Sequence, residues 1–302
     1  MQGRTDASLP RPVVFGEVLF DHFPDGSAVL GGAPFNVAWH LRGFGLEPLF
    51  VSRVGDDERG REIADAMADW TLDVSGLQRD PDRPTGEVRV ALTDGQPTFD
   101  ILADRAYDAI DPGTAAAAAS ARPAGLLYHG TLALRGRTSR EALARVREAT
   151  DAPAFLDVNL RPPWTGRDDV LEALDGARWA KVNEAELLDL TGEDREPGPA
   201  ARTLAERHDL DAVIVTLGAD GAIWSDRQEI RASAAAVEGG DIIDTVGAGD
   251  AFASVCIAGL LRGMTAERIL QTAHRFAVEI CGIRGAVARD PDLYRRVFRD
   301  GR

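Results

Sequence analysis

The sequence contains one lysine, Lys181, among 34 basic residues, and all the others are arginines. A phosphate-binding loop of the Walker A type needs a lysine followed by serine or threonine, because that lysine contacts the nucleotide phosphates. Lys181 is followed by Val182, so the chain has no such loop. Any phosphate site must therefore use backbone amides, arginines, a metal ion or Lys181, which we interpret as a strand-edge lysine.

Cysteine and long apolar runs are also scarce. The two cysteines, Cys256 and Cys281, lie in apolar helical contexts and indicate buried thiols in a reducing compartment, not a disulfide framework. No apolar run approaches the roughly 18 residues that a membrane span needs. Residues 1–12 lack the apolar segment of a signal peptide. We therefore expect a cytoplasmic protein.

The charge balance is strongly acidic, with a net charge of −15 and a pI of about 4.8. Such a charge argues against a nucleic acid or an anionic membrane as partner. The length of 302 residues fits one large α/β domain with a small appendage.

Strand-like and helical segments alternate along most of the chain. An apolar run at 12–20 indicates a first strand, and residues 1–11 a flexible tail. Strand-like runs follow at 49–54, 125–128, 154–157, 179–182 and 212–216, with helical stretches at 36–44, 59–70, 139–148, 168–174, 184–190 and 200–208. This alternation predicts a mostly parallel sheet covered on both faces, with ligands at the carboxyl ends of its strands.

A predicted hairpin interrupts this alternation. Residues 86–92 alternate apolar and polar side chains, and residues 98–102 can pair with them across the turn at 93–97. We expect a small β lid formed by about 12–30 and 84–104. Tyr107 follows the second of these strands, and it either closes over a ligand or packs the hinge.

The stretch from Asp244 to Phe252, DTVGAGDAF, is the most informative part of the sequence. A strand-like run at 241–243 precedes it, and an apolar helix from Ala251 follows. Small residues that open a helix leave backbone N–H groups free to bind an anion. Asp250 in this turn is either a general base for phosphoryl transfer or a helix-capping residue.

Four other groups of residues are candidates for ligand binding. Asp21, Gly32 and Asn36 suit the hydroxyls of a sugar, or are a turn residue and a helix cap. Asn183 and Glu186 open a helix and suit hydrated Mg²⁺, or only cap that helix. Asp157 and Arg161 suit a phosphate or a sugar, or they belong to a surface loop. Thr216, Gly218 and Gly221 suit a nucleotide, or they form an ordinary turn.

Four motifs in order resemble those of the ribokinase, or PfkB-type, family of sugar kinases. They are GGAPFNVA at 31–38, NEAE at 183–186, TLGADG at 216–221 and DTVGAGDAF at 244–252. The resemblance covers nearly the whole chain. Segments such as FGEVLFDHFP at 15–24 and DVNLR at 157–161 are most similar to bacterial fructokinases.

The resemblance implies a fold, an active site and a set of ligands. The fold would be a ribokinase-like three-layer αβα sandwich spanning residues 12–302. Asp250 would be the general base, and the amides of Gly247, Ala248 and Gly249 would stabilise the transferring phosphoryl group. The sugar would bind at Asp21, Gly32, Asn36, Asp157 and Arg161; ATP at Asn183, Glu186, Thr216, Gly218 and Gly221; Mg²⁺ through water at Glu186; and a monovalent cation such as K⁺ at Asp244.

We therefore expect ATP-dependent phosphorylation of a free sugar, with fructose converted to fructose 6-phosphate. Ribose, 2-keto-3-deoxygluconate, a sugar phosphate and a nucleoside remain alternative substrates. A catalytically silent sugar-binding regulator is disfavoured by the presence of Asp250 and Glu186. A nicotinamide-dependent oxidoreductase is disfavoured because no GxGxxG follows the first strand. The expected partners are the sugar and ATP, and a homodimer joined through the lid is left open.

Overall fold

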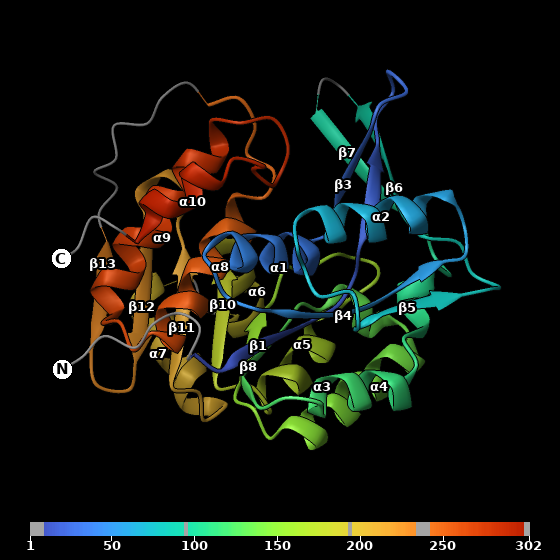
Figure 1. The fold of residues 1–302 in the computed structure, drawn as a ribbon. Coiled ribbons are helices and arrows are strands. Elements are labelled where there is room, and N and C mark those ends of the chain that lie inside the picture. The colour runs from blue at the N-terminus through green and yellow to red at the C-terminus, as the bar shows by residue number, and fades with distance from the viewer. Residues whose placement is uncertain (1–8, 94–95, 193–194, 234–241, 299–302) are drawn as a thin grey trace.

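The computed structural model describes residues 9–93, 96–192, 195–233 and 242–298. Within this part of the chain, a nine-stranded sheet forms the centre of the molecule (Figure 1). Seven of its strands pair in parallel, whereas the edge strand β13 and its neighbour β12 are joined to the sheet by antiparallel pairing. In spatial order the strands are β13 (Ile230–Ser233), β12 (Ala222–Asp226), β11 (Ala212–Thr216), β10 (Trp179–Asn183), β9 (Ala154–Asp157), β8 (Ala124–His129), β1 (Arg11–Phe15), β4 (Leu49–Gly55) and β5 (Leu77–Asp80).

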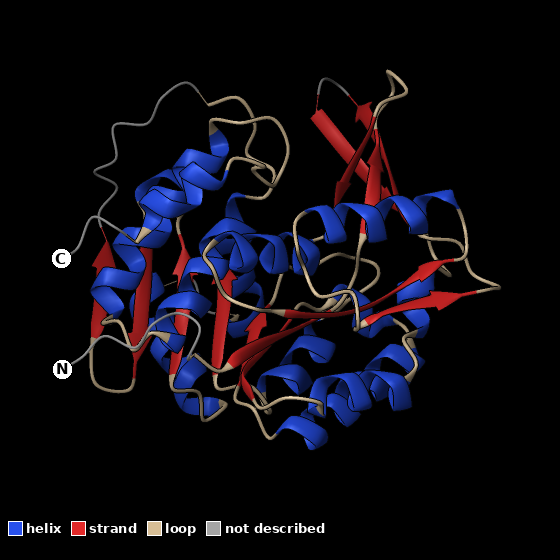
Figure 2. Ribbon diagram, viewed as in Figure 1, coloured by secondary structure: helices blue, strands red, loops and turns tan. Residues whose placement is uncertain are grey.

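Helices cover both faces of this sheet, as Figure 2 shows. One apolar core packs the first face against α1 (Ala33–Gly43), α2 (Glu58–Asp69), α8 (Ala248–Leu261), α9 (Ala266–Cys281) and α10 (Pro291–Val297). Two further cores pack the other face against α3 (Pro112–Ser120), α4 (Arg137–Thr150), α5 (Arg167–Leu174), α6 (Glu184–Thr191) and α7 (Pro197–Arg207). The predicted three-layer α/β architecture with a mostly parallel sheet is confirmed.

A separate four-stranded sheet projects from the main body and forms the lid (Figure 1). Its strands, in spatial order, are β3 (Ala28–Gly31), β2 (Leu19–His22), β6 (Gly86–Thr93) and β7 (Gln96–Ile101). The single strand expected at 12–20 is instead two strands, and the first of them, β1, belongs to the central sheet. Gly16 separates them with φ +150°, and a Cβ there would lie 2.4 Å from Cγ of Pro34. The lid therefore begins at Leu19 rather than at residue 12.

Three other expectations need correction. The flexible tail was expected to extend to residue 11, but Arg11 is the first residue of β1. Arg11 is 5% exposed and forms an ion pair with Asp73 at 3.5 Å. Residues 1–8 lie outside the described part. Ile242 and Ile243 are not in a strand, and residue 241 is not described. Cys256 is buried, whereas Cys281 is partly exposed. No helix in the described ranges has both the length and the hydropathy to cross a bilayer.

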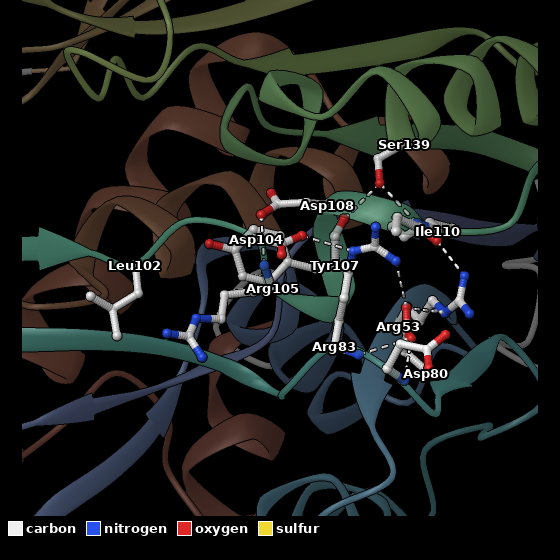
Figure 3. A network of polar contacts seen from close by, with 12 residues as sticks. Arg53, Asp80, Arg83, Leu102, Asp104, Arg105, Tyr107, Asp108, Ile110 and Ser139 are labelled. Carbon is white, nitrogen blue, oxygen red and sulfur yellow. Dashed lines mark hydrogen bonds and ion pairs between the residues drawn. The ribbon is translucent and has the colours of Figure 1, made fainter.

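A polar network at the base of the lid fixes it to the main body. The Arg135 guanidinium donates to both carboxylate oxygens of Asp108 (2.7 and 2.9 Å), to the Tyr107 hydroxyl (2.9 Å) and to the carbonyl of Leu102, the residue after β7 (2.7 Å). Figure 3 shows Tyr107 and Asp108 of this network together with Ser139, whose hydroxyl donates to the Tyr107 carbonyl at 2.6 Å. Tyr107 is fully buried, so of its two predicted roles it packs the hinge.

Candidate active site

A cleft of about 770 Å³ lies between the lid and the carboxyl ends of the central strands. Parallel strands bring distant segments together at this edge, because each strand ends in a loop on the same side. The residues that line the cleft include eleven of the predicted site residues: Asp21, Gly32, Asn36, Asp157, Arg161, Asn183, Glu186, Thr216, Gly247, Gly249 and Asp250.

Asp250 lies in the first turn of α8 and keeps partial access to the cleft. Gly247 caps this helix with φ +82°, and a Cβ there would lie 2.4 Å from Cβ of Ala286, so the turn requires glycine. Among the described residues, no group accepts a hydrogen bond from the N–H groups of Gly247, Gly249 and Asp250. The start of α8 therefore offers free donors beside a carboxylate.

Burial raises the pKa of the Asp250 carboxyl to about 7. A hydrogen bond from Asn36 Nδ2 to Asp250 Oδ2, at 2.8 Å, opposes this shift because it favours the charged form. The nearby charge of Asp157 raises the pKa, whereas Lys181 and Arg161 lower it. A pKa near neutrality is suited to a group that must accept a proton and then release it.

Asn36 is not a helix cap, because α1 begins at Ala33 with Gly32 as its N-cap. Its side chain is 4% exposed and lines the cleft, and its Nδ2 is committed to Asp250. Asn36 Oδ1 is buried without a partner among the described residues. Asn36 therefore holds the predicted base through its Nδ2 group.

Lys181 is not a strand-edge lysine, as the sequence had indicated. It lies in β10, between β9 and β11, and it is 7% exposed. Lys181 is the register partner of Asp157 in β9, and its Nζ lies 2.9 and 3.1 Å from the two Asp157 oxygens. The Asp157 carboxylate, predicted to contact the substrate, is therefore held in a buried ion pair at the floor of the cleft.

Asn183 and Glu186 form a reciprocal cap at the start of α6. Asn183 Oδ1 accepts from the Glu186 N–H at 2.8 Å, and Glu186 Oε2 accepts from the Asn183 N–H at 2.8 Å. Glu186 Oε1 accepts from the Leu160 N–H at 2.9 Å. These bonds hold a charged carboxylate rigidly at the cleft wall, where its remaining lone pairs can accept from the water ligands of a cation.

On the lid side, Asp21 in β2 faces the cleft near Gly32 and Arg161. Burial raises the pKa of the Asp21 carboxyl to about 6, and the charge of Arg161 opposes the shift. Gly32 has φ +108°, and a Cβ there would lie 2.8 Å from the Glu17 carbonyl oxygen. Only glycine leaves the backbone open to a ligand at this position.

Four predicted residues are not among those that line the cleft. Ala248 donates its N–H to the Thr245 carbonyl at 3.3 Å, so it does not provide a free donor as expected. Gly218 and Gly221 lie in a short turn after Thr216, with positive φ angles of 60° and 100°. Asp244 ties two loops together by accepting from Val246 N–H (3.0 Å) and Gly285 N–H (3.2 Å).

Sequence reasoning missed two acidic residues that line this cleft, the exposed Asp100 in β7 and the buried Glu17. Glu17 lies between β1 and β2 and is 5% exposed. The available signal was a charged residue inside an otherwise apolar run from Val13 to Phe20. Within the described ranges, no three His, Cys, Asp or Glu side chains gather in a metal-ligand group.

Comparison with known proteins relates the chain to carbohydrate kinases. The sequence model of the pfkB family carbohydrate kinases matches residues 14–293. A fructokinase from Klebsiella pneumoniae is 31% identical over 271 residues, which cover 85% of this chain and 85% of that protein.

Solved structures agree in fold. A double mutant of the fructokinase from Vibrio cholerae O395, bound to fructose, ADP and potassium ion, has a TM-score of 0.76 and 25% identity and covers 97% of this chain and 99% of its own. Aminoimidazole riboside kinase from Salmonella enterica, with aminoimidazole riboside and an ATP analog, has a TM-score of 0.79 and 25% identity, with coverages of 95% and 99%. The cleft at the strand ends, the carboxylate at the start of α8 and these matches lead to one conclusion: the chain belongs to the pfkB family of carbohydrate kinases.

Proposed function

We propose that this protein is an ATP-dependent kinase that converts fructose to fructose 6-phosphate. The observation that supports it most directly is the position of Asp250, beside the free N–H groups that begin α8 and inside the shared cleft. A base next to a set of anion-binding donors is the arrangement that phosphoryl transfer to an alcohol requires.

In this proposal Asp250 accepts the proton of the sugar hydroxyl as its oxygen attacks the γ-phosphorus of ATP. A new O–P bond forms, and the bond from phosphorus to the leaving oxygen of ADP breaks. The N–H groups of Gly247 and Gly249 face the charge on the transferring group and stabilise it without reorganisation. Asn36 keeps the Asp250 carboxylate oriented through its 2.8 Å hydrogen bond.

We propose ATP as the ligand of the cleft residues Asn183, Glu186 and Thr216, together with the turn that follows Thr216 and contains Gly218 and Gly221. Mg²⁺ bound with ATP would neutralise phosphate charge, and Glu186 would hold it through water. We propose Asp244 for a monovalent cation, because its carboxylate joins the loop before α8 to the loop at Gly285. A cytoplasmic location is part of the proposal.

Fructose is proposed because the chain is similar to fructokinases in sequence as well as in fold. The similarity to a riboside kinase makes a nucleoside the second candidate for the same site. A homodimer joined through the lid is also proposed. Its support is that β7 is an edge strand of the lid sheet, and an edge strand presents backbone groups with which a second copy can pair.

The test is ADP release on mixing the protein with ATP, Mg²⁺ and one acceptor at a time. The panel holds fructose, ribose, 2-keto-3-deoxygluconate and a purine riboside, with a mixture lacking any acceptor as the control. We expect the highest kcat/KM with fructose and a product phosphorylated at the 6-position by NMR. A higher value for another acceptor would reject fructose but not the kinase. Binding of sugars without any ADP release would instead support the silent regulator.

A further inference from the structure

Glu17 is a buried acid for which the mechanism above has no use. It lies in the three-residue connection between β1 and β2, where the central sheet gives way to the lid. Its side chain lines the cleft together with Asp21, Asn36 and Asp250. Because β1 ends here, Glu17 lies at the strand-end edge where parallel sheets bind their ligands.

The protein satisfies the Glu17 carboxylate only in part. Its Oε2 is buried and has no hydrogen-bond partner among the described residues. Burial raises its pKa to about 7, and the charge of Asp250 acts in the same direction. A hydrogen bond from the Glu17 backbone opposes this shift, as do the charges of Arg161 and Arg135, but neither arginine forms an ion pair with Glu17 in the described structure.

Arg135 and Arg161 both interact with groups other than Glu17. Arg135 is paired with Asp108, and the Arg161 side chain donates to its own neighbour, the Leu160 carbonyl, at 3.2 Å. A second cavity of about 20 Å³ adjoins Glu17, lined also by Thr131, Asn159 and Arg161. Such a cavity has room for about one water molecule. Glu17 therefore lies between the large cleft and a small polar pocket.

An unpartnered buried carboxylate is costly, so a ligand that provides a donor at this position gains affinity from it. A sugar carries several O–H donors, whereas a phosphate group brings charge of the same sign as Glu17. The acid also directly precedes the lid strand β2, which carries Asp21, whereas Glu186 and Thr216 lie in α6 and β11 of the main body.

We infer that Glu17 is a specificity-determining residue, which accepts a hydrogen bond from one hydroxyl of the sugar and so selects substrates that carry it. The inference rests on the proposed function, because it assumes that the cleft phosphorylates a sugar. It assigns to Glu17 a different hydroxyl from the one bound by Asp21, since the two acids reach the cleft from different segments, the hinge and β2.

The experiment measures kcat/KM for the preferred sugar and for each of its singly deoxygenated derivatives. For the wild type we expect that loss of the hydroxyl bound by Glu17 lowers kcat/KM by about 10- to 100-fold, the range for a hydrogen bond to a charged group. In Glu17→Ala, kcat/KM for the same derivative should be less than about 3-fold below kcat/KM for the parent sugar, because the acceptor is already gone. Glu17→Leu fills the buried space with a side chain that has no acceptor, and it provides the same test if Glu17→Ala does not fold.

Two control variants complete the design. Asp21→Ala should reduce discrimination at a different hydroxyl. Asp25→Asn, in the exposed turn between β2 and β3, should leave the ratio of kcat/KM between the parent sugar and each derivative unchanged. Equal losses of kcat/KM for all derivatives in the Glu17 variants would show a purely structural role and overturn the inference. A wild type that phosphorylates no sugar would overturn the proposed function instead, and thermal unfolding of each variant distinguishes misfolding from both outcomes.

Discussion

The carboxylates on the two sides of the cleft differ in how completely the protein satisfies them. At the floor of the cleft, Asp157 is paired with Lys181, and on the nucleotide side Glu186 accepts two backbone N–H groups. On the sugar side, Glu17 has an unpartnered oxygen, and no hydrogen bond to the Asp21 side chain is found in the described ranges. Both pKa values on the sugar side are raised, to about 7 and about 6.

This difference indicates that the nucleotide side and the sugar side of the cleft, its two walls, have different roles in ligand binding. A satisfied carboxylate is rigid before any ligand arrives, which suits the constant geometry of a triphosphate and its metal ion. An unsatisfied carboxylate is complete only when a hydroxyl donates to it, which suits selection between similar sugars. The predictions below test whether the two walls differ in this way.

The largest effect is expected at Asp250, which lies between the two walls. Asp250→Asn keeps the size of the side chain but removes the proton acceptor. We expect kcat to fall by about 10²- to 10⁴-fold, the usual contribution of a positioned base, while ATP and sugar still bind. Steady-state kinetics together with calorimetric titration of each ligand measure both quantities, and a turnover near that of the wild type would remove Asp250 from the mechanism.

At the floor of the cleft, Lys181→Met should lower the free energy of unfolding by about 3–5 kcal/mol, because it leaves the Asp157 carboxylate buried without its counter-charge. Arg178→Met is a matched control, because its ion pair with Asp211 has side chains 55% and 45% exposed. Arg178→Met should lower the free energy of unfolding by less than about 1 kcal/mol. Urea denaturation of both variants measures the difference, and similar losses would contradict the assigned importance of the buried pair.

On the sugar wall, Asp21→Ala should weaken sugar binding by about 10- to 100-fold and leave ATP affinity within about 2-fold. Unlike Lys181→Met, it should not lower the stability of the ligand-free protein, because it removes a partly buried charge that has no ion-pair partner in the described structure. Titration calorimetry and thermal unfolding check the two parts. Unchanged sugar affinity would place the sugar elsewhere.

The smallest effect is a change in pH dependence. Asp250 acts as a base only when ionised, and its pKa is raised to about 7, so kcat/KM should fall as the pH decreases through 7. The hydrogen bond from Asn36 favours the ionised form. Asn36→Ala should therefore raise the pKa of Asp250 further and move the acid limb of the kcat/KM profile to higher pH. A shift to lower pH would contradict this role of Asn36.

Local patterns in the sequence predicted most of the fold. The alternation of strands and helices after residue 124 appears in the structure as β8 to β11 with their helices, because each strand is apolar and each helix has one apolar face. The lid hairpin followed from the alternating residues of β6. The break at Gly16 was missed because the apolar run continues on both sides of it, and only the approach of Pro34 requires the turn.

The candidate site was predicted in part for a similar reason. Residues within short motifs, such as Asn183 with Glu186, were found because their spacing is local. Lys181 was misjudged because its partner Asp157 is 24 residues away, and only the register between β9 and β10 places them side by side. Glu17 was missed because burial without a partner is a property of the surroundings, which a single sequence does not contain.

The solitary lysine also makes the chain a reporter of its own unfolding. A protease that cleaves only after lysine has one cleavage site, Lys181, and that bond lies within β10 between two hydrogen-bonded neighbours. A strand in the middle of a sheet cannot enter a protease active site until the sheet opens. Each cut would yield fragments 1–181 and 182–302, so the appearance of two bands would time the opening of the central sheet directly, without any label.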